Sequence, residues 1–165
     1  NSDIMMVLDI CSPYNHSKDN TAKDMTITHK WAQEAYNYWS QTPSNQWLFA
    51  IVQGGFYKDL REQSAETLTN IPFPGFALGG LSVGEPMELC HEYIKHCAPL
   101  LPNNKPKYVM GIGLPENIEW AIRCGIDMFD CVLPTRLARH GQFFENNDRV
   151  NIGQATLVFF STSGV

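Results

Sequence analysis

The segment Leu48-Phe49-Ala50-Ile51-Val52-Gln53-Gly54-Gly55 joins five consecutive apolar residues to an amide and two glycines. Five apolar residues without polar alternation are typical of a strand that is buried on both faces of a parallel sheet. The amide and the glycines predict that this strand ends in a turn where a ligand can approach the backbone. A plain turn is the alternative interpretation of these three residues.

Four other segments share this pattern of a short apolar run that ends in a polar residue, a glycine or a proline. They are Ile4–Leu8 before Asp9, Gly75–Leu78 before Gly79 and Gly80, Tyr108–Met110 before Gly111, and Ile126–Leu133 before Pro134. Helix-like stretches separate them, at residues 21–39, 57–69, 86–97 and 115–123. This alternation predicts an α/β fold with a parallel sheet, either doubly wound or part of a (β/α)8 barrel.

The positions of the unusual residues favour the barrel. They lie at or near the C-terminal ends of the predicted strands, where barrel enzymes have their active sites: Asp9, Gln53, Gly80, Gly111 and Asp130. A complete barrel takes about 250 residues, whereas the chain has 165 residues. About five βα units would not close a TIM barrel by themselves, so the doubly wound sheet stays open as the alternative at this point.

The composition, with 44% hydrophobic and 18% charged residues, is that of a folded domain. No apolar run is long enough for a membrane-spanning helix, so we expect no membrane role. The net charge of −5 argues against binding nucleic acid by bulk electrostatics, and any RNA site must be local. Five cysteines without paired spacing indicate reduced thiols in the cytoplasm, and they do not predict a metal site.

Two carboxylates, Asp127 and Asp130, interrupt the apolar run Ile126–Leu133. Strand side chains alternate, so residues three apart point to opposite faces, and Asp130 is nearer the C-terminal end. A carboxylate there could attack an electrophilic sugar carbon, as in double-displacement glycosyl transfer. The alternative is a buried aspartate whose oxygens accept bonds from backbone N–H groups or an arginine.

Other polar groups are expected on the same rim. Asp9 is a second acid at a strand exit, with an Asx turn ahead of Pro13 as the alternative. Residues 79–84 lack the lysine of a phosphate-binding P-loop and are better interpreted as exposed backbone N–H groups. Acids, an amide and exposed N–H groups could together form hydrogen bonds with the edge of a planar heterocycle. Residues 135–141 form a basic patch suited to phosphates, or a solvated loop.

Five segments resemble, in order, the motifs of the tRNA-guanine transglycosylases, also called queuine tRNA-ribosyltransferases. These segments are Asp9–Tyr14, Ile51–Gly55, Ala77–Glu85, Tyr108–Gly113 and Asp127–Arg136, and the similarity extends over about 2–152. The resemblance implies a (β/α)8 barrel enzyme of queuosine biosynthesis. Such an enzyme exchanges the wobble guanine of certain tRNAs for a 7-deazaguanine, either queuine or its aminomethyl precursor, without an energy cofactor.

The resemblance also implies a role for particular residues. Asp130 corresponds to the nucleophile that holds the ribose covalently, Asp9, Gln53 and Gly80 read the edge of the base, and Met110 packs on its plane. The segments that contact the RNA around the flipped-out target correspond to Gly111, Ile112, Gly113, Leu114, Pro115, Glu116 and Asn117, and to Thr135, Arg136, Leu137, Ala138 and Arg139.

The chain also departs from the family pattern. The acid–base motif Asp-Ser-Gly-Gly-Phe-Gln is expected before Asn1, and the family's zinc subdomain after Val165. We expect residues 1–152 to form a partial catalytic barrel that lacks its N-terminal strands, and residues 153–165 a divergent or truncated tail. The chain alone is predicted to be inactive, and the whole enzyme could be a homodimer. The alternatives are a non-catalytic RNA-binding subunit and an unrelated barrel enzyme acting on a small metabolite.

Overall fold

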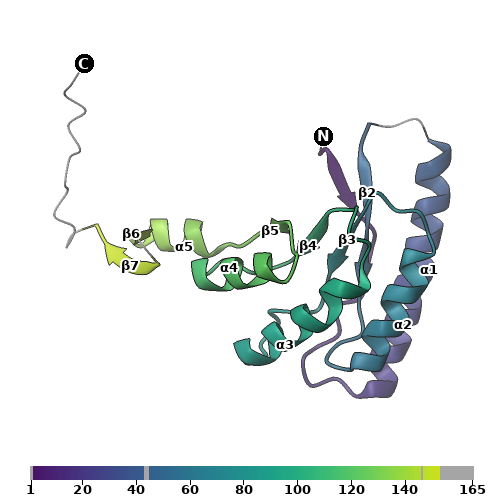
Figure 1. Cartoon of the computed structure of the whole chain (residues 1–165), viewed down its shortest axis with the longest axis horizontal. Helices are drawn as coiled ribbons and strands as arrows, with labels where there is room; N and C mark the ends of the chain where they lie inside the picture. The colour runs from purple at the N-terminus through teal and green to yellow at the C-terminus, as the bar shows by residue number, and fades with distance from the viewer. Residues whose placement is uncertain (1, 43–44, 146, 153–165) are drawn as a thin grey trace.

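The computed structural model describes residues 2–42, 45–145 and 147–152. Five parallel strands form one sheet in the order β1-β2-β3-β4-β5. Figure 1 shows the sheet with its helices, and successive helices from α1 to α4 contact each other. The strands are β1 (Ile4–Met6), β2 (Trp47–Val52), β3 (Gly75–Leu78), β4 (Lys107–Val109) and β5 (Met128–Phe129). The helices are α1 (Lys18–Gln41), α2 (Lys58–Thr69), α3 (Met87–Cys97), η1 (Ala98–Leu100), α4 (Pro115–Arg123) and α5 (Leu133–Arg139).

This architecture confirms the prediction of a partial (β/α)8 barrel in which each strand is followed by a helix. Strand β2 shows how the sheet is buried on both faces. Leu48 lines a cavity together with Ala35 and Trp39 of α1, so it lies on the face that the helices cover. Because side chains alternate along a strand, Phe49 and Ile51 point to the opposite, concave face. All residues of β2 after Trp47 are buried.

Helix α1 begins three residues before the predicted start, because Ser17 caps it. The Ser17 hydroxyl accepts a hydrogen bond from the Asn20 backbone N–H at 3.4 Å, which satisfies one of the free donors of the first turn. Strand β1 ends at Met6 instead of Leu8, and the Leu8 side chain is 72% exposed. The chain between β1 and α1 is therefore a longer loop than the sequence predicted.

The C-terminal part of the described chain differs most from the sequence prediction. The expected strand at 126–133 forms pairs only at Met128 and Phe129, and helix α5 begins at Leu133 with Pro134 in its first turn. Thr135 to Arg139, for which a loop was an alternative, are helical. An antiparallel hairpin that the sequence did not predict follows, with strands β6 (Gln142–Glu145) and β7 (Asp148–Asn151). The expected tail at 153–165 lies outside the described residues.

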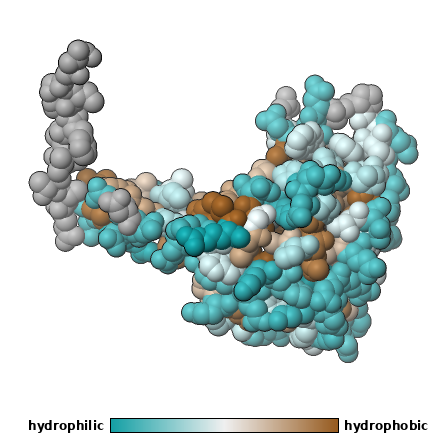
Figure 2. Space-filling view, in the orientation of Figure 1, coloured by the Kyte–Doolittle hydropathy of each residue, from teal (hydrophilic) through white to brown (hydrophobic). Residues whose placement is uncertain are grey.

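Within the described ranges, none of the helices is both long and apolar enough to cross a lipid bilayer. Figure 2 shows hydrophilic side chains over most of the surface of α1 to α3, whereas apolar side chains gather where β5 leads into α5. Val132, in this connecting segment, is 61% exposed. The apolar surface therefore lies beside the C-terminal ends of the strands, not over the helices.

Gly75 gives a direct test of the packing on the concave face. A Cβ atom at this position would lie 2.3 Å from Cζ of Phe49, on the paired position of the neighbouring strand. We expect Gly75→Ala to lower the free energy of unfolding by about 1–3 kcal/mol through overpacking. Denaturant unfolding of the protein that contains this chain measures the change.

The control is the double variant Gly75→Ala with Phe49→Leu, because leucine removes the ring tip that the new methyl group would contact. The two substitutions should cost less together than the sum of their separate effects. A strictly additive result would show that Phe49 does not limit the space at Gly75.

Candidate active site

The strand register brings the predicted site residues to one edge of the sheet. Val52 pairs with Leu78, Leu78 with Val109, and Val109 with Phe129. In each of the four strands β2 to β5, the residue that follows the last paired residue therefore lies at the same height along the sheet. These residues are Gln53, Gly79, Met110 and Asp130, and Gly80 follows Gly79. The C-terminal edge of the sheet thus collects an amide, a carboxylate and the backbone of two glycines, which are buried and not exposed as the sequence indicated.

Gln53 connects this edge to Asp9. Its Nε2 donates a hydrogen bond to Oδ2 of Asp9 at 2.6 Å, and the Gln53 side chain is almost fully buried. Oε1 of Gln53 has no hydrogen-bond partner among the described residues. A buried amide oxygen without a donor costs free energy. The C-terminal edge therefore offers an acceptor that an N–H group of a ligand could satisfy.

Two glycines make room for the Gln53 side chain. A Cβ atom at Gly79 would lie 2.4 Å from Nε2 of Gln53, and one at Gly80 would lie 2.6 Å from Oε1. Gly80 also has a φ of +64°, a conformation that residues with side chains rarely adopt. The β3–α3 loop can therefore lie against the Gln53 amide only because both positions are glycine.

Arg61 of α2 lies behind these loops and is fully buried. Its guanidinium donates to four carbonyl oxygens: Gly55 O at 2.8 Å from Nε, Val52 O at 2.9 Å and Gly79 O at 2.7 Å from Nη1, and Gly80 O at 3.2 Å from Nη2. Burial lowers the pKa of Arg61 from its ordinary value, yet a guanidinium stays protonated in proteins. No ion pair between Arg61 and a carboxylate occurs in the described part of the chain.

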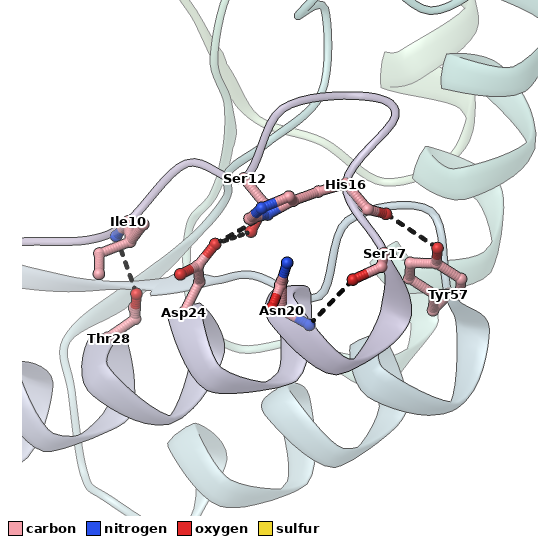
Figure 3. Close-up of polar contacts among 8 residues, drawn as sticks. All are labelled: Ile10, Ser12, His16, Ser17, Asn20, Asp24, Thr28 and Tyr57. Carbon is pink, nitrogen blue, oxygen red and sulfur yellow. Dashed lines mark hydrogen bonds and ion pairs between the residues drawn. The ribbon is translucent and has the colours of Figure 1, made fainter.

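The loop that carries Asp9 is fastened to α1 and α2 by the polar contacts drawn in Figure 3. The Ile10 backbone N–H donates to Oγ1 of Thr28 at 2.9 Å. Oδ2 of Asp24 accepts from the Ser12 hydroxyl at 2.8 Å and lies 3.2 Å from Nδ1 of His16. The Tyr57 hydroxyl donates to the His16 carbonyl oxygen at 2.9 Å. These contacts hold the loop at both of its ends.

Cys11 lies in the same loop, and its surroundings show that the loop reaches the glycines of β3–α3. Partial desolvation and the Asp9 carboxylate raise the pKa of the Cys11 thiol, whereas the Arg61 guanidinium and the Gly80 backbone N–H act in the opposite direction. The thiol is therefore neutral at pH 7. The Gly80 N–H is not used by another backbone group of the described chain.

Asp130 accepts two hydrogen bonds on one carboxylate oxygen. The Tyr108 hydroxyl donates to Oδ1 at 2.5 Å, and the Gly111 backbone N–H donates to the same atom at 3.0 Å. Burial, and then the hydrogen bond to Asp130, raise the pKa of Tyr108 above its ordinary value, so the phenol remains a donor. No described residue donates to Oδ2. One oxygen is thus held in place while the other is available to react.

The second aspartate of this segment has a different position. Asp127 accepts the Lys107 backbone N–H on Oδ2 at 2.8 Å, at the opposite end of β5 from Asp130. Both aspartates are exposed, so neither is the buried, unpaired charge that the apolar sequence around them indicated. The short β5 explains the exposure, because only two residues of the run enter the sheet.

The two predicted RNA-binding segments border one cavity of about 220 Å³. The cavity is lined by Gly111, Leu114 and Asn117 on one side and by Cys131, Leu133 and Arg136 on the other, among other residues. Arg136 and Arg139 are exposed on α5, as are Thr135 and Ala138. Three members of the two segments have buried side chains that pack against neighbouring residues. They are Ile112, Asn117 and Leu137.

Asn117 is engaged in the contact between α3 and α4. Its Oδ1 lies 3.0 Å from Nε2 of His91, and the His91 ring stacks on Trp120 with 4.3 Å between the ring centroids.

The cysteines and histidines of α3 do not form a metal site among the described residues. Burial first, and Glu85 second, raise the pKa of the buried Cys90 thiol to about 12. No three His, Cys, Asp or Glu side chains within the described ranges are grouped so that they could hold a metal ion.

Sequence reasoning missed three residues that shape the site: Tyr108, Arg61 and Cys11. Tyr108 precedes Met110 by two and so shares its face of β4, which is a signal that strand alternation could have provided. Arg61 is indistinguishable in sequence from a surface arginine of an amphipathic helix. Cys11 stood inside a recognised segment, but its proximity to Gly80 depends on the loop conformation.

Comparisons with known proteins give a consistent result. The profile of the family described as "Queuine tRNA-ribosyltransferase" matches residues 1–160. The queuine tRNA-ribosyltransferase of Oleidesulfovibrio alaskensis is 51% identical over 152 residues, which cover 92% of this chain and 40% of that protein. The protein of the same name from Photobacterium profundum is 47% identical, covering 93% of this chain and 41% of the relative.

The relative from Dictyoglomus turgidum, also named queuine tRNA-ribosyltransferase, is 50% identical over 155 residues and is covered to 40% of its length. The chain therefore spans about 40% of the length of these curated relatives. The match includes every strand of the parallel sheet and every site residue on its C-terminal edge. On this ground the resemblance inferred from the five motifs is confirmed, and the chain belongs to the queuine tRNA-ribosyltransferase family.

Proposed function

We propose that the protein containing this chain is a base-exchange glycosyltransferase that replaces the wobble guanine of tRNA with a 7-deazaguanine through a covalent Asp130–ribose intermediate. The observation that carries the proposal is the pairing of two features on one rim. Asp130 has one fixed and one available carboxylate oxygen, and the buried Gln53, bound to the half-buried Asp9, leaves an unsatisfied acceptor at the same edge. The names of the relatives support the same reaction class.

Asp130 would act as the nucleophile in two displacement steps. Its Oδ2 attacks the ribose anomeric carbon, the bond from that carbon to guanine breaks, and the bonding electrons leave with the base. The departing guanine anion takes up a proton. The incoming base gives up its ring N–H proton as it attacks the same carbon and expels the carboxylate, so the protons balance and the configuration of the ribose is retained. The bonds from Tyr108 and Gly111 to Oδ1 hold the carboxylate plane in the orientation for attack.

The base would bind between Asp9, Gln53 and Gly80. A 7-deazaguanine presents N–H donors, which the Asp9 carboxylate and Oε1 of Gln53 can accept, and a carbonyl oxygen, which the Gly80 N–H can bind. Met110 follows β4 at the same level and would pack on the plane of the base. This arrangement pairs each polar group of the pocket with a complementary group of the ligand.

RNA contact would be confined to the rim around the cavity between the β4–α4 loop and α5. Arg136 and Arg139 supply positive charge there, in a chain whose net charge is −5. The wobble nucleotide must leave its stack to bring its ribose to Asp130. The exposed apolar segment around Val132 could cover the base or ribose once it is extruded.

The alternative is a non-catalytic RNA-binding subunit that keeps the fold. Such a subunit would not require an aspartate held by two donors and open on its second oxygen. Catalysis without an energy cofactor, a cytoplasmic location and a homodimer stay predictions. So does the zinc of the family: the described residues do not form a site that fits it, and no step above depends on a metal.

The nucleophile is tested by Asp130→Asn in the protein that contains this chain. An amide cannot form the covalent ester, so a tRNA adduct trapped on a denaturing gel should disappear. The matched control is Asp127→Asn, which removes a carboxylate three residues away at the other end of β5 and should leave the adduct intact. An adduct that persists in Asp130→Asn would exclude Asp130 as the nucleophile.

Tyr108→Phe tests whether the phenol positions Asp130. The substitution removes one hydrogen bond to a charged group, worth about 1.5–3 kcal/mol. We expect kcat for exchange of labelled guanine into tRNA to fall roughly ten- to hundred-fold, with little change in KM for the base. An unchanged kcat would show that Gly111 alone fixes the carboxylate.

The base pocket is tested by ligand-dependent stabilisation. Excess 7-deazaguanine should raise the melting temperature of the protein, because it binds the folded state. Asp9→Asn should largely abolish the shift, since it replaces an acceptor oxygen with a donor facing the same N–H groups. Asp148→Asn on the exposed hairpin is the matched control. If both variants respond alike, Asp9 does not contact the base.

A further inference from the structure

We propose that Arg61 is a positioning residue that fixes and polarises the peptide groups reading the base, and that its charge strengthens the Gly80 N–H as a hydrogen-bond donor. The proposal rests on the proposed function, because it assigns this effect to the pocket for a 7-deazaguanine. It concerns a residue that touches no substrate. Arg61 acts through the backbone that lies between its guanidinium and the pocket.

The guanidinium joins two loops that approach the pocket from neighbouring strands. It binds Val52 O and Gly55 O at the end of β2, and Gly79 O and Gly80 O at the end of β3. The four distances range from 2.7 to 3.2 Å. A planar fork with several donors suits this task, whereas a lysine ammonium could reach only part of the set.

Among the described residues, no carboxylate forms an ion pair with the Arg61 guanidinium. Buried charges in proteins are normally paired, because a cation removed from water loses its hydration. Arg61 is fully buried, and within the described ranges its hydrogen bonds go only to backbone oxygens. Its positive charge is thus not neutralised by a nearby carboxylate, and it acts on the peptide dipoles that it contacts.

One of these dipoles leads directly to the ligand. The Gly79 carbonyl and the Gly80 N–H belong to the same peptide unit. A cation at 2.7 Å from that carbonyl oxygen draws electron density toward the oxygen, which makes the N–H at the other end a stronger donor. The Gly80 N–H is bonded to no other backbone group among the described residues, and Gly80 lies against the Gln53 amide at the C-terminal edge. A carbonyl oxygen of the base would be an acceptor for this N–H.

The same helix fixes the backbone of Gln53 from the other side. The Gln53 N–H donates to Oγ of Ser64 at 3.2 Å, and Oγ lies 2.9 Å from Nε2 of His29 on α1. Burial lowers the pKa of His29, so its ring is neutral and can accept the Ser64 hydroxyl proton. Arg61 and Ser64 lie three residues apart on one face of α2. Helix α2 therefore supports both base-reading loops.

The test compares two ligands in Arg61 variants of the protein that contains this chain. The ligands are 7-deazaguanine and 2-amino-7-deazapurine, which lacks the 6-oxo group and, with it, the proton on N1, so the test compares how each Arg61 variant changes the ratio of the two constants. Arg61→Gln removes the charge, and Arg61→Lys keeps it without the fork. We expect Arg61→Gln to weaken binding of 7-deazaguanine about ten-fold, with a change of less than about two-fold for the analogue without the carbonyl. Arg61→Lys should fall between Arg61→Gln and the unaltered protein.

The ratio of the two dissociation constants separates positioning from a general structural role, because a loosened pocket would weaken both ligands equally. Arg123→Gln is the matched control on the exposed face of α4 and should leave both constants unchanged. An unchanged ratio in Arg61→Gln would overturn the proposal. If both Arg61 variants lose their cooperative melting transition, Arg61 is a folding residue and the proposal also fails.

Failure of the proposed function would look different. In that case the unaltered protein would not bind 7-deazaguanine, and the ratio could not be defined for any variant. If the unaltered protein prefers 7-deazaguanine over its analogue but Arg61→Gln keeps that preference, the function stands and only the role of Arg61 is wrong.

Discussion

The parallel register of the five strands is the constraint on which the site depends. Because the pairs Val52–Leu78, Leu78–Val109 and Val109–Phe129 are fixed, the residue that follows each strand can lie only at one level. A shift of one residue in any strand would turn its site residue toward the helices. The apolar side chains of both faces maintain the register, so the core determines the geometry of the rim. The geometry of the candidate site is thus a consequence of ordinary sheet packing.

Much of the arrangement could be predicted because strand ends are visible in the sequence. The apolar runs and the residues that stop them located Asp9, Gln53, Gly80 and Asp130 on one edge, since parallel strands share a direction. The partners of these residues could not be predicted in the same way. Arg61 binds carbonyl oxygens, which every residue has, so no pattern of side chains marks it. The short β5 also escaped prediction, because the apolar run Ile126–Leu133 continues into a helix.

The two acids of the rim have different surroundings, and this difference fits two different tasks. Asp9 is half-buried and is bound to the buried amide of Gln53. Asp130 is exposed and is held through one oxygen by a phenol and a backbone N–H. An acid that reads a base benefits from a dry, fixed partner. An acid that attacks a sugar carbon needs one oxygen without a strong donor.

Gly113 and Cys131 bring the loop after β4 into contact with the segment after β5. A Cβ atom at Gly113 would lie only 2.1 Å from Cβ of Cys131, so the two loops are in contact where one side chain is missing. Any larger residue at 113 would push the segment that begins at Asp130. Across the family, these two positions should therefore covary in size, and sequence drift in the loop after β4 should be restricted by the need to keep the segment of Asp130 in place.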